Sequence, residues 1–335
     1  MYLLAGGMGW VGSWVARQLA MEGEEVLAVD IARRSHPHWH GLEDRIQYAS
    51  ASVMDFPELL NIFKMFEGRI KGIVDLAYHL PVPMWHTREE KPIWRPMDLP
   101  GGPMAHDPYK QVMTHVEGCM NLFELCRQFK VSNFVFIASG AIYGDMEGVW
   151  QEDTIDPQCF YSVSKRSVEL IGGQYRRDYG LDFKSCRIMH VYGGILPLAT
   201  SHPVHRVFFG PLQGLTEAHA PMGGDQLQNM TYIKDIADGI CCALKTHLPK
   251  HTTFNIAGPE LLTSQQIIDS VKEYLGGSLN LTLGPGCFVS RYRVGGPIDV
   301  SRAREELGYV PQYDIRKGVK DYAEWIRSIA TVSPK

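Results

Sequence analysis

Residues 1–12 read MYLLAGGMGWVG, an apolar, strand-like run that passes directly into glycines at positions 6, 9 and 12 and then into a helix-like stretch. Glycines allow a tight turn, let the backbone approach a pyrophosphate and let the helix pack closely on the sheet, while the helix N-terminus attracts phosphate charge. The pattern therefore predicts a dinucleotide-binding turn; the simpler alternative is a tight strand-to-helix turn without a ligand. The residues expected to contact the dinucleotide are Gly6, Gly9, Trp10, Val11 and Gly12.

Asp30, eighteen residues beyond Gly12 at the end of the second predicted strand, is placed to accept hydrogen bonds from an adenosine ribose. Because a carboxylate would repel a 2′-phosphate, NAD is expected rather than NADP, although the nearby Arg33 and Arg34 leave NADP open. Asp55 has two interpretations of equal weight. It either contacts the adenine edge or caps a helix.

Outward from this turn, short apolar runs alternate with longer amphipathic stretches, which is the pattern of βαβ units and a parallel sheet. The expected strands span residues 1–5, 25–29, 46–48, 72–77, 133–138 and 183–188, with helices at 109–129 and 160–179. A loop-rich stretch over 193–224 precedes a helix at about 232–248, a strand at 253–257, and helices at 264–275 and 315–329.

This order predicts an α/β fold, a doubly wound parallel sheet with a smaller C-terminal lobe that binds substrate. We expect residues 1–190, continued by about 229–257, to form the nucleotide-binding domain. Residues 191–228 and 258–335 are expected to form the substrate-binding lobe.

The composition narrows the class of partner. The chain has 335 residues and a formal net charge of -4, with 33 basic and 37 acidic side chains and no block of like charge. This balance of charges predicts no basic surface for the phosphate backbone of a nucleic acid, so we expect a small-molecule substrate. Seven scattered cysteines without a Cys-x-x-Cys spacing favour reduced thiols in the cytoplasm. The sequence has no apolar run of about 18 residues, so no membrane span is expected.

The segment Tyr161-Ser162-Val163-Ser164-Lys165 places a phenol and an ammonium four residues apart, on one face of a predicted helix. A nearby ammonium stabilises a phenolate and draws the tyrosine pKa down from about 10 toward neutrality, where the phenol can exchange a proton. Ser139, at the carboxyl end of a predicted strand, could hold a substrate oxygen beside Tyr161. Alone, the Tyr-x-x-x-Lys spacing also fits a solvated helix face. Combined with the glycine turn and Asp30, it makes Ser139, Tyr161 and Lys165 the candidates for catalysis.

Further segments with recognisable motifs lie at 75–77, 139–144, 187–193, 232–237, 254–258 and 307–311. In this order, with the glycine turn and Asp30, the chain resembles the extended short-chain dehydrogenase/reductase family, or NAD-dependent epimerase/dehydratase family. The resemblance implies a Rossmann domain, a tightly held NAD beside Leu76 and Ala77, and a homodimer formed through the helices at 109–129 and 160–179. It also implies that Tyr161 is the acid/base, that Lys165 holds the nicotinamide ribose, and that Ser139 polarises the reacting oxygen.

Three departures from the family pattern bear on the substrate. The 4,6-dehydratases carry an Asp-Glu pair where this chain has Gly140 and Ala141, so dehydration lacks its acid and base. The nucleotide-sugar epimerases usually place an arginine at the position of Gln228, and a neutral amide cannot replace a guanidinium on phosphate. Arg291 or Arg293 could still supply that contact.

The third departure is the segment 78–110, which is longer than the family leads us to expect. If it forms a wall of the substrate pocket, Trp85 and Trp94 offer apolar faces to a sugar ring; the alternative is a packing loop.

The histidines are weak candidates. His190 stands where the family often has asparagine, and either a substrate contact or a structural role is open for it. His36, His38 and His40 are read as a loop over the adenine end, and no metal site is expected.

The leading hypothesis is an NAD-dependent oxidoreductase that transfers hydride from a secondary hydroxyl of a sugar, sugar acid or polyol. An NAD-dependent sugar epimerase is the alternative, since it runs the same oxidation and returns hydride to the other face. A non-catalytic NAD-binding sensor is a third hypothesis. The candidate substrate contacts are Trp85, Ser139, Gly140, Ala141, His190, Gln228 and Arg291.

Overall fold

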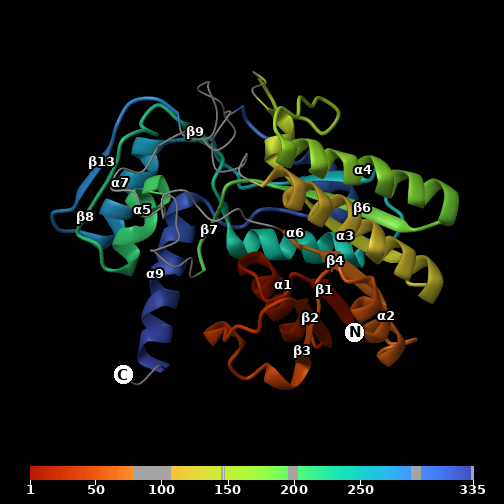
Figure 1. Cartoon of the computed structure of the whole chain (residues 1–335). Coiled ribbons are helices and arrows are strands. Elements are labelled where there is room, and N and C mark those ends of the chain that lie inside the picture. Colours follow the sequence, from red (N-terminus) through yellow and green to blue (C-terminus); the bar gives the residue numbers. More distant parts are fainter. Residues whose placement is uncertain (79–106, 145, 147, 195–202, 288–295, 333–335) are drawn as a thin grey trace.

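The protein is built on a seven-stranded parallel sheet in the order β11-β6-β5-β4-β1-β2-β3 (Figure 1). The computed structural model describes residues 1–78, 107–144, 146, 148–194, 203–287 and 296–332. This architecture confirms the predicted α/β fold with a doubly wound parallel sheet. Its strands are β1 Tyr2–Ala5, β2 Val26–Asp30, β3 Ile46–Ser50, β4 Gly72–Asp75, β5 Asn133–Ser139, β6 Asp182–Ile188 and β11 Thr253–Ile256.

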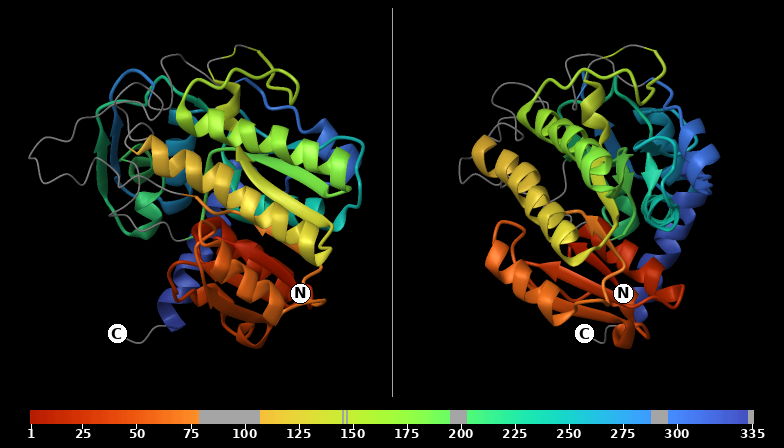
Figure 2. Two further views of the ribbon diagram at one scale, coloured as in Figure 1. Left: turned by 45° about the vertical axis from the view of Figure 1, so that its right-hand side comes forward. Right: turned by 90° about the vertical axis from the view of Figure 1, so that its right-hand side faces the viewer.

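Helices cover both faces of this sheet, and the two hydrophobic cores lie between helices and strands. Along β5 the side chains alternate, with Phe134 and Phe136 in one core and Val135 and Ile137 in the other. Helices α3 and α4 lie side by side over the first of these faces (Figure 2). That face carries α2 Phe56–Met65, α3 Pro108–Phe129 and α4 Phe160–Tyr179, and the opposite face carries α1 Trp10–Met21 and α6 Ile233–Lys245.

The remaining elements form a smaller lobe, and one part of it differs from the sequence prediction. The stretch 193–224, expected to be loop-rich, contains a helix and a strand, because Val204, Val207 and Phe208 recur at helical spacing and are buried. The lobe consists of β7 Val191–Tyr192, α5 Pro203–Phe209, β8 Glu217–Ala220, β9 Leu227–Gln228, β10 Thr231–Tyr232, β12 Leu262–Thr263, α7 Ser264–Leu275, β13 Asn280–Leu283 and α9 Ile315–Val332. Helix α8 Ser301–Leu307 packs against β11 and α6.

Several element boundaries also differ from the prediction, and two of them have clear local reasons. Strand β4 ends at Asp75 rather than at residue 77, because the Asp75 carboxylate accepts a hydrogen bond from the Ala77 N–H and turns the chain. Helix α6 ends at Lys245 rather than at residue 248, since Leu248 precedes Pro249 and adopts a positive φ of 45°.

Within the described part of the chain, no helix combines the length and apolar character needed to cross a membrane.

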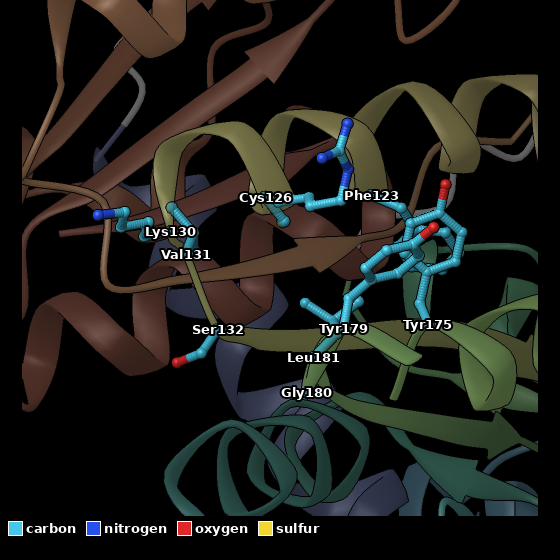
Figure 3. Close-up of a pocket in the computed structure, with 10 residues that line it drawn as sticks. Phe123, Cys126, Lys130, Val131, Ser132, Tyr175, Tyr179, Gly180 and Leu181 are labelled. Carbon is cyan, nitrogen blue, oxygen red and sulfur yellow. The ribbon is translucent and has the colours of Figure 1, made fainter. Parts of the chain in front are cut away.

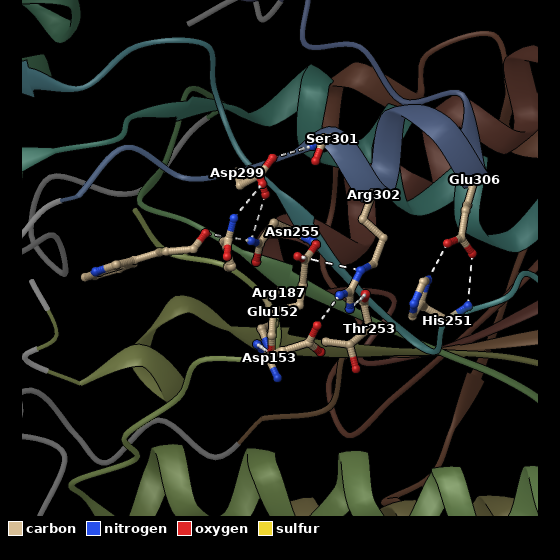
Figure 4. Close-up of polar contacts among 12 residues, drawn as sticks. Glu152, Asp153, Arg187, His251, Thr253, Asn255, Asp299, Ser301, Arg302 and Glu306 are labelled. Atoms are coloured by element: carbon tan, nitrogen blue, oxygen red, sulfur yellow. Dashed lines mark hydrogen bonds and ion pairs between the residues drawn. The ribbon is translucent and has the colours of Figure 1, made fainter. Parts of the chain in front are cut away.

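A buried polar network joins the sheet to the segment just before α8, and Figure 4 shows the part of it around Arg187, Glu152, Asn255 and Asp299. Arg187 on β6, with no exposed surface, donates to both carboxylate oxygens of Glu169 on α4, at 2.9 and 2.8 Å. It also donates to the Tyr143 hydroxyl at 3.1 Å and to the Glu152 carbonyl at 2.8 Å. Asn255 on β11 continues the network by donating to the carbonyl of Asp299, just before α8. The network therefore connects elements that are far apart in the sequence.

An aromatic cluster connects the C-terminal helix α9 to α1. The His38 ring stacks on Trp14 of α1 at a centroid distance of 4.5 Å, and Trp325 of α9 approaches both rings. Within the described residues, neither ring nitrogen of His38 has a hydrogen-bond partner. Burial, with a smaller contribution from His36, lowers the pKa of His38 to about 3. His38 is therefore neutral in the folded protein.

The lowered pKa of His38 makes the free energy of unfolding depend on pH. The unfolded chain protonates His38 near its ordinary pKa of about 6.5, whereas the folded chain does so only near pH 3, so the stabilising difference is lost as pH falls below about 6.5. We expect His38 to contribute at most about 1.4 kcal/mol per pH unit to the fall in the free energy of unfolding. Urea denaturation between pH 7 and pH 4 should show a shallower fall in His38→Phe. The control His40→Phe, at an exposed position, should keep the wild-type slope; equal slopes in all three proteins would refute the idea.

Candidate active site

The glycine turn leaves no room for side chains. Gly6 has a φ of 78°, in the left-handed region, and a Cβ there would lie 2.9 Å from the backbone of Leu76. A Cβ on Gly12 would lie 2.4 Å from the Gly6 carbonyl oxygen. Helix α1 begins directly after Gly9, which provides no side-chain cap, so the N–H groups of its first turn face the turn itself. The backbone thus forms a cradle of the kind that a pyrophosphate can approach.

Asp30 lies against this turn. Its Oδ2 accepts a hydrogen bond from the Met8 N–H at 3.1 Å, and its Oδ1 accepts one from the Ala32 N–H at 3.3 Å. Arg34 lies 3.8 Å from the same carboxylate and donates to the Met8 carbonyl at 3.1 Å. A carboxylate and a guanidinium therefore both border the place expected for an adenosine ribose. Asp55 caps α2 by accepting from the Glu58 N–H at 3.0 Å, which matches the capping interpretation; contact with adenine remains a prediction.

Gly12→Ala tests the cradle. We expect the added methyl group to displace the turn and weaken NAD binding by about tenfold or more, measured by isothermal titration calorimetry. Gly173→Ala on α4 is the matched control, because a Cβ there meets only Arg177 at 3.6 Å, an ordinary contact. Unchanged NAD affinity in Gly12→Ala would contradict the assignment of this turn.

Ser139, Tyr161 and Lys165 meet at the carboxyl end of β5. Ser139 is the last residue of this strand, and its Oγ accepts a hydrogen bond from the Ala141 N–H at 3.2 Å. Tyr161, in the first turn of α4, is hydrogen-bonded to the Ser139 side chain. One turn later, Lys165 is buried, and its Nζ donates to the Ile137 carbonyl at 2.7 Å and lies 5.9 Å from the Tyr161 ring centroid. The three predicted catalytic side chains thus form one cluster.

The electrostatics of Tyr161 differ from the sequence expectation. The expected ammonium effect would draw the tyrosine pKa down, but burial raises the pKa of Tyr161 to about 12, and the hydrogen bond from Ser139 opposes this only in part. The reason is that the Lys165 ammonium is bonded to a β5 carbonyl rather than directed at the phenol oxygen. Burial also lowers the pKa of Lys165 to about 8, with Asp75 acting in the opposite direction.

The site contains residues that the sequence did not single out. The rings of Tyr78 and His115 stack at a centroid distance of 5.6 Å, and both meet the Tyr161 ring edge-on, at 5.3 and 5.5 Å. His115 on α3 is also hydrogen-bonded through Nδ1 to Ser164 of α4, at 2.7 Å. One sequence pattern could have indicated His115, because His115 and Cys119 lie four residues apart on one face of the predicted helix.

The other predicted contacts are dispersed. Leu76 and Ala77 follow β4, beside the glycine turn. Gly140 is buried, and a Cβ on it would meet Met189. His190 follows β6 and is half-buried, and burial lowers its pKa to about 4. Gln228 is buried in the small lobe, where its amide lies 3.5 Å from the Ser264 hydroxyl. Trp85, Trp94, Arg291 and Arg293 lie outside the described residues.

A pocket of about 250 Å³ lies at the other end of α3 and α4 (Figure 3). Its lining includes Tyr175 and Tyr179, which on α4 are roughly 20 Å or more along the axis from Tyr161 at about 1.5 Å per residue. The pocket is therefore remote from the catalytic cluster. Among the described residues, no group of histidine, cysteine and acidic side chains is placed to hold a metal ion.

Comparisons with known proteins agree with this geometry. Residues 103–257 match the model of the NAD dependent epimerase/dehydratase family. A UDP-glucose 4-epimerase of Lacticaseibacillus casei is 26% identical, with 92% of this chain and 91% of that protein covered. A solved UDP-glucose 4-epimerase from Thermotoga maritima, 23% identical, superposes with a TM-score of 0.77 over 99% of both chains. An L-threonine 3-dehydrogenase from Trypanosoma brucei, 20% identical, reaches 0.80 over 98% of both.

The two solved structures establish a Rossmann-type α/β fold. Residues 103–257 match the NAD dependent epimerase/dehydratase family, and the similarity to the epimerase of Lacticaseibacillus casei extends over 92% of the chain.

Proposed function

We propose that this protein is an NAD-dependent enzyme that oxidises a secondary hydroxyl of a sugar, sugar acid or related polyol. One observation carries the proposal: Tyr161 is hydrogen-bonded to Ser139 at the carboxyl end of β5, with Lys165 one helical turn behind. In sheets of this kind ligands bind at the carboxyl ends of the strands. The match of residues 103–257 to the NAD dependent epimerase/dehydratase family adds support.

The residues present fit NAD. The cradle at Gly6 and Gly12 would receive the pyrophosphate, and Asp30 would accept hydrogen bonds from the adenosine ribose. Arg34 partly neutralises Asp30, which leaves some capacity for NADP. Bound NAD supplies the hydride acceptor. Solved relatives from Thermus thermophilus and Bacillus cereus are described with NAD, which supports this choice.

The proton chemistry belongs to the chain itself. Ser139 would donate a hydrogen bond to the substrate oxygen and orient it, and Tyr161 would take the hydroxyl proton as the carbon is oxidised. Lys165, held by the Ile137 carbonyl, would hold the nicotinamide ribose and stabilise the phenolate through its charge. Gly140 and Ala141 provide neither acid nor base, so the proposal includes no dehydration step.

A sugar epimerase is the second candidate, favoured by the similarity to the epimerase from Lacticaseibacillus casei over nearly the whole chain. Gln228 weighs against a diphosphate-linked sugar, since its side chain is buried beside Ser264. Both candidates use the same oxidation and differ in whether NADH leaves the enzyme.

The decisive experiment incubates the purified protein with NAD and free sugars, sugar acids or UDP-sugars. NADH absorbance and the configuration of the recovered substrate are followed in parallel. Stoichiometric NADH with one substrate would establish the dehydrogenase. Inversion without net NADH would establish the epimerase, and neither activity across the panel would count against both.

We also propose that the protein is a homodimer formed through α3 and α4. These adjacent helices expose several large apolar side chains, a feature of partner surfaces. Light scattering coupled to size exclusion tests this, and a monomer would refute it. The exposed residues are Tyr109, Met120, Phe160, Val163 and Leu170.

A cytoplasmic location belongs to the same proposal. It is supported by the seven cysteines, none of which forms a disulfide in the structure.

A further inference from the structure

Asp75 is a buried carboxyl group that none of the steps above uses. It is the last residue of β4, pairs in register with Ala5 of β1 and Phe136 of β5, and is 2% exposed. Its Oδ1 accepts a hydrogen bond from the Ala77 N–H at 3.0 Å. Its side chain is also hydrogen-bonded to the Cys119 thiol of α3, so it lies on the face of the sheet that α3 and α4 cover.

Lys165 reaches the same part of the sheet from α4. Its Nζ lies 4.6 Å from the ring centroid of Phe136, the residue directly opposite Asp75, and donates to the carbonyl of Ile137. Three elements therefore bring Asp75, Cys119 and Lys165 together on the buried face of the sheet that α3 and α4 cover. Lys165 is 3% exposed, and Cys119 has no exposed surface.

The acidic groups around Lys165 can be compared to find the one that balances its charge. The acidic groups that face it are Asp75 from β4, Cys119 from α3 and Glu169 from its own helix. Burial raises the pKa of the Cys119 thiol, which stays neutral. Glu169 already accepts two hydrogen bonds from Arg187. Among the described acidic groups that face Lys165, Asp75 is therefore the one that is charged and not already paired with Arg187.

The titration of the pair agrees with this assignment. Burial raises the pKa of Asp75 to about 6, and Lys165 opposes the rise. Burial lowers the pKa of Lys165 to about 8, and Asp75 opposes the fall. Between these two values both groups carry charge, and each favours the charged form of the other.

We propose that Asp75 is a positioning residue that keeps Lys165 charged, and through Lys165 allows Tyr161 to give up its proton. The proposal rests on the function assigned above. Without Asp75, burial acts on Lys165 unopposed, the ammonium loses its proton near neutral pH, and the phenolate of Tyr161 loses the charge that stabilises it. Asp75 itself touches neither substrate nor cofactor in this assignment.

The first test measures Lys165 directly and needs no substrate. In protein labelled with 13C-lysine, the Lys165 signal is assigned by its disappearance in Lys165→Arg, and its pKa is followed by NMR in wild type and in Asp75→Asn. We expect the pKa of Lys165 to fall by about 1–3 units in Asp75→Asn. An unchanged pKa would overturn the proposal, whatever reaction the protein catalyses.

The second test compares melting temperatures, so that it remains informative even if the single variant Asp75→Asn folds poorly. Because breaking one partner of a buried ion pair costs more than replacing both, the double variant Asp75→Asn/Lys165→Met should melt at a higher temperature than Asp75→Asn alone. If the double variant instead loses as much melting temperature as the two single variants together, the two groups are not coupled.

The third test links the pair to turnover. For the substrate found active, the alkaline limb of the kcat profile, where Lys165 loses its proton, should move to lower pH in Asp75→Asn. A parallel loss of kcat at every pH would mean a merely structural role. If no substrate is found while the first two tests succeed, the proposed function fails and the coupling between Asp75 and Lys165 stands.

Discussion

Replacing Tyr161 by phenylalanine is expected to lower kcat by about 10²–10⁴-fold and to leave NAD binding intact, because the phenol oxygen is the group proposed to take the proton. Phenylalanine keeps the ring that packs against Tyr78 and His115, so the pocket should retain its shape. The hydrogen bond to Ser139 is lost, and water is a poor replacement in a buried position. Turnover and NAD affinity should be measured on the same preparation.

A matched control lies on the same helix. Tyr179, the last residue of α4, is 59% exposed, and Tyr179→Phe should keep wild-type turnover. Full activity in Tyr161→Phe would remove the proton-transfer role and favour the hypothesis of a non-catalytic NAD-binding sensor. Loss of both turnover and NAD affinity would indicate a disturbed site and would not support the role proposed here.

Replacing Arg187 by methionine is expected to lower the free energy of unfolding by about 3–5 kcal/mol, the usual loss when one partner of a buried ion pair is removed. The guanidinium has no exposed surface, and its neighbourhood raises its pKa, chiefly through Glu169 against the effect of burial. Its removal takes two hydrogen bonds from the Glu169 carboxylate, which keeps those from Arg166 and Ser185. It also leaves the Tyr143 hydroxyl and the Glu152 carbonyl without the hydrogen bonds that Arg187 donates to them. Chemical denaturation measures the loss.

Arg166→Met is the matched control, since Arg166 bonds the same Glu169 at 3.0 Å but its side chain is 30% exposed. Its loss should be about 0–1 kcal/mol, as for pairs near the surface. Replacing both Arg187 and Glu169 by methionine should recover part of the stability, because no buried charge is then left alone. Equal losses in Arg187→Met and Arg166→Met would contradict this account of the network.

Much of the fold could be predicted from local sequence patterns. Helices α4 and α7 begin and end at the predicted residues, because a periodic apolar face and good boundary residues specify a helix locally. The glycines of the first turn and the Tyr161–Lys165 spacing are also local features. The prediction was wrong over 193–224, where the burial of α5 against distant elements decides the structure.

The sequence by itself determined the parallel α/β fold, the glycine turn and the placement of Tyr161 and Lys165 on one helical face, because each depends on residues a few positions apart. Only the tertiary structure decided that Asp75 and Cys119 lie with Lys165, since that depends on the order β1-β4-β5 and on how α3 and α4 cover it. It also decided the pKa of Tyr161, because burial, which no local pattern specifies, raises this pKa, and the hydrogen bond from Ser139 opposes the rise only in part.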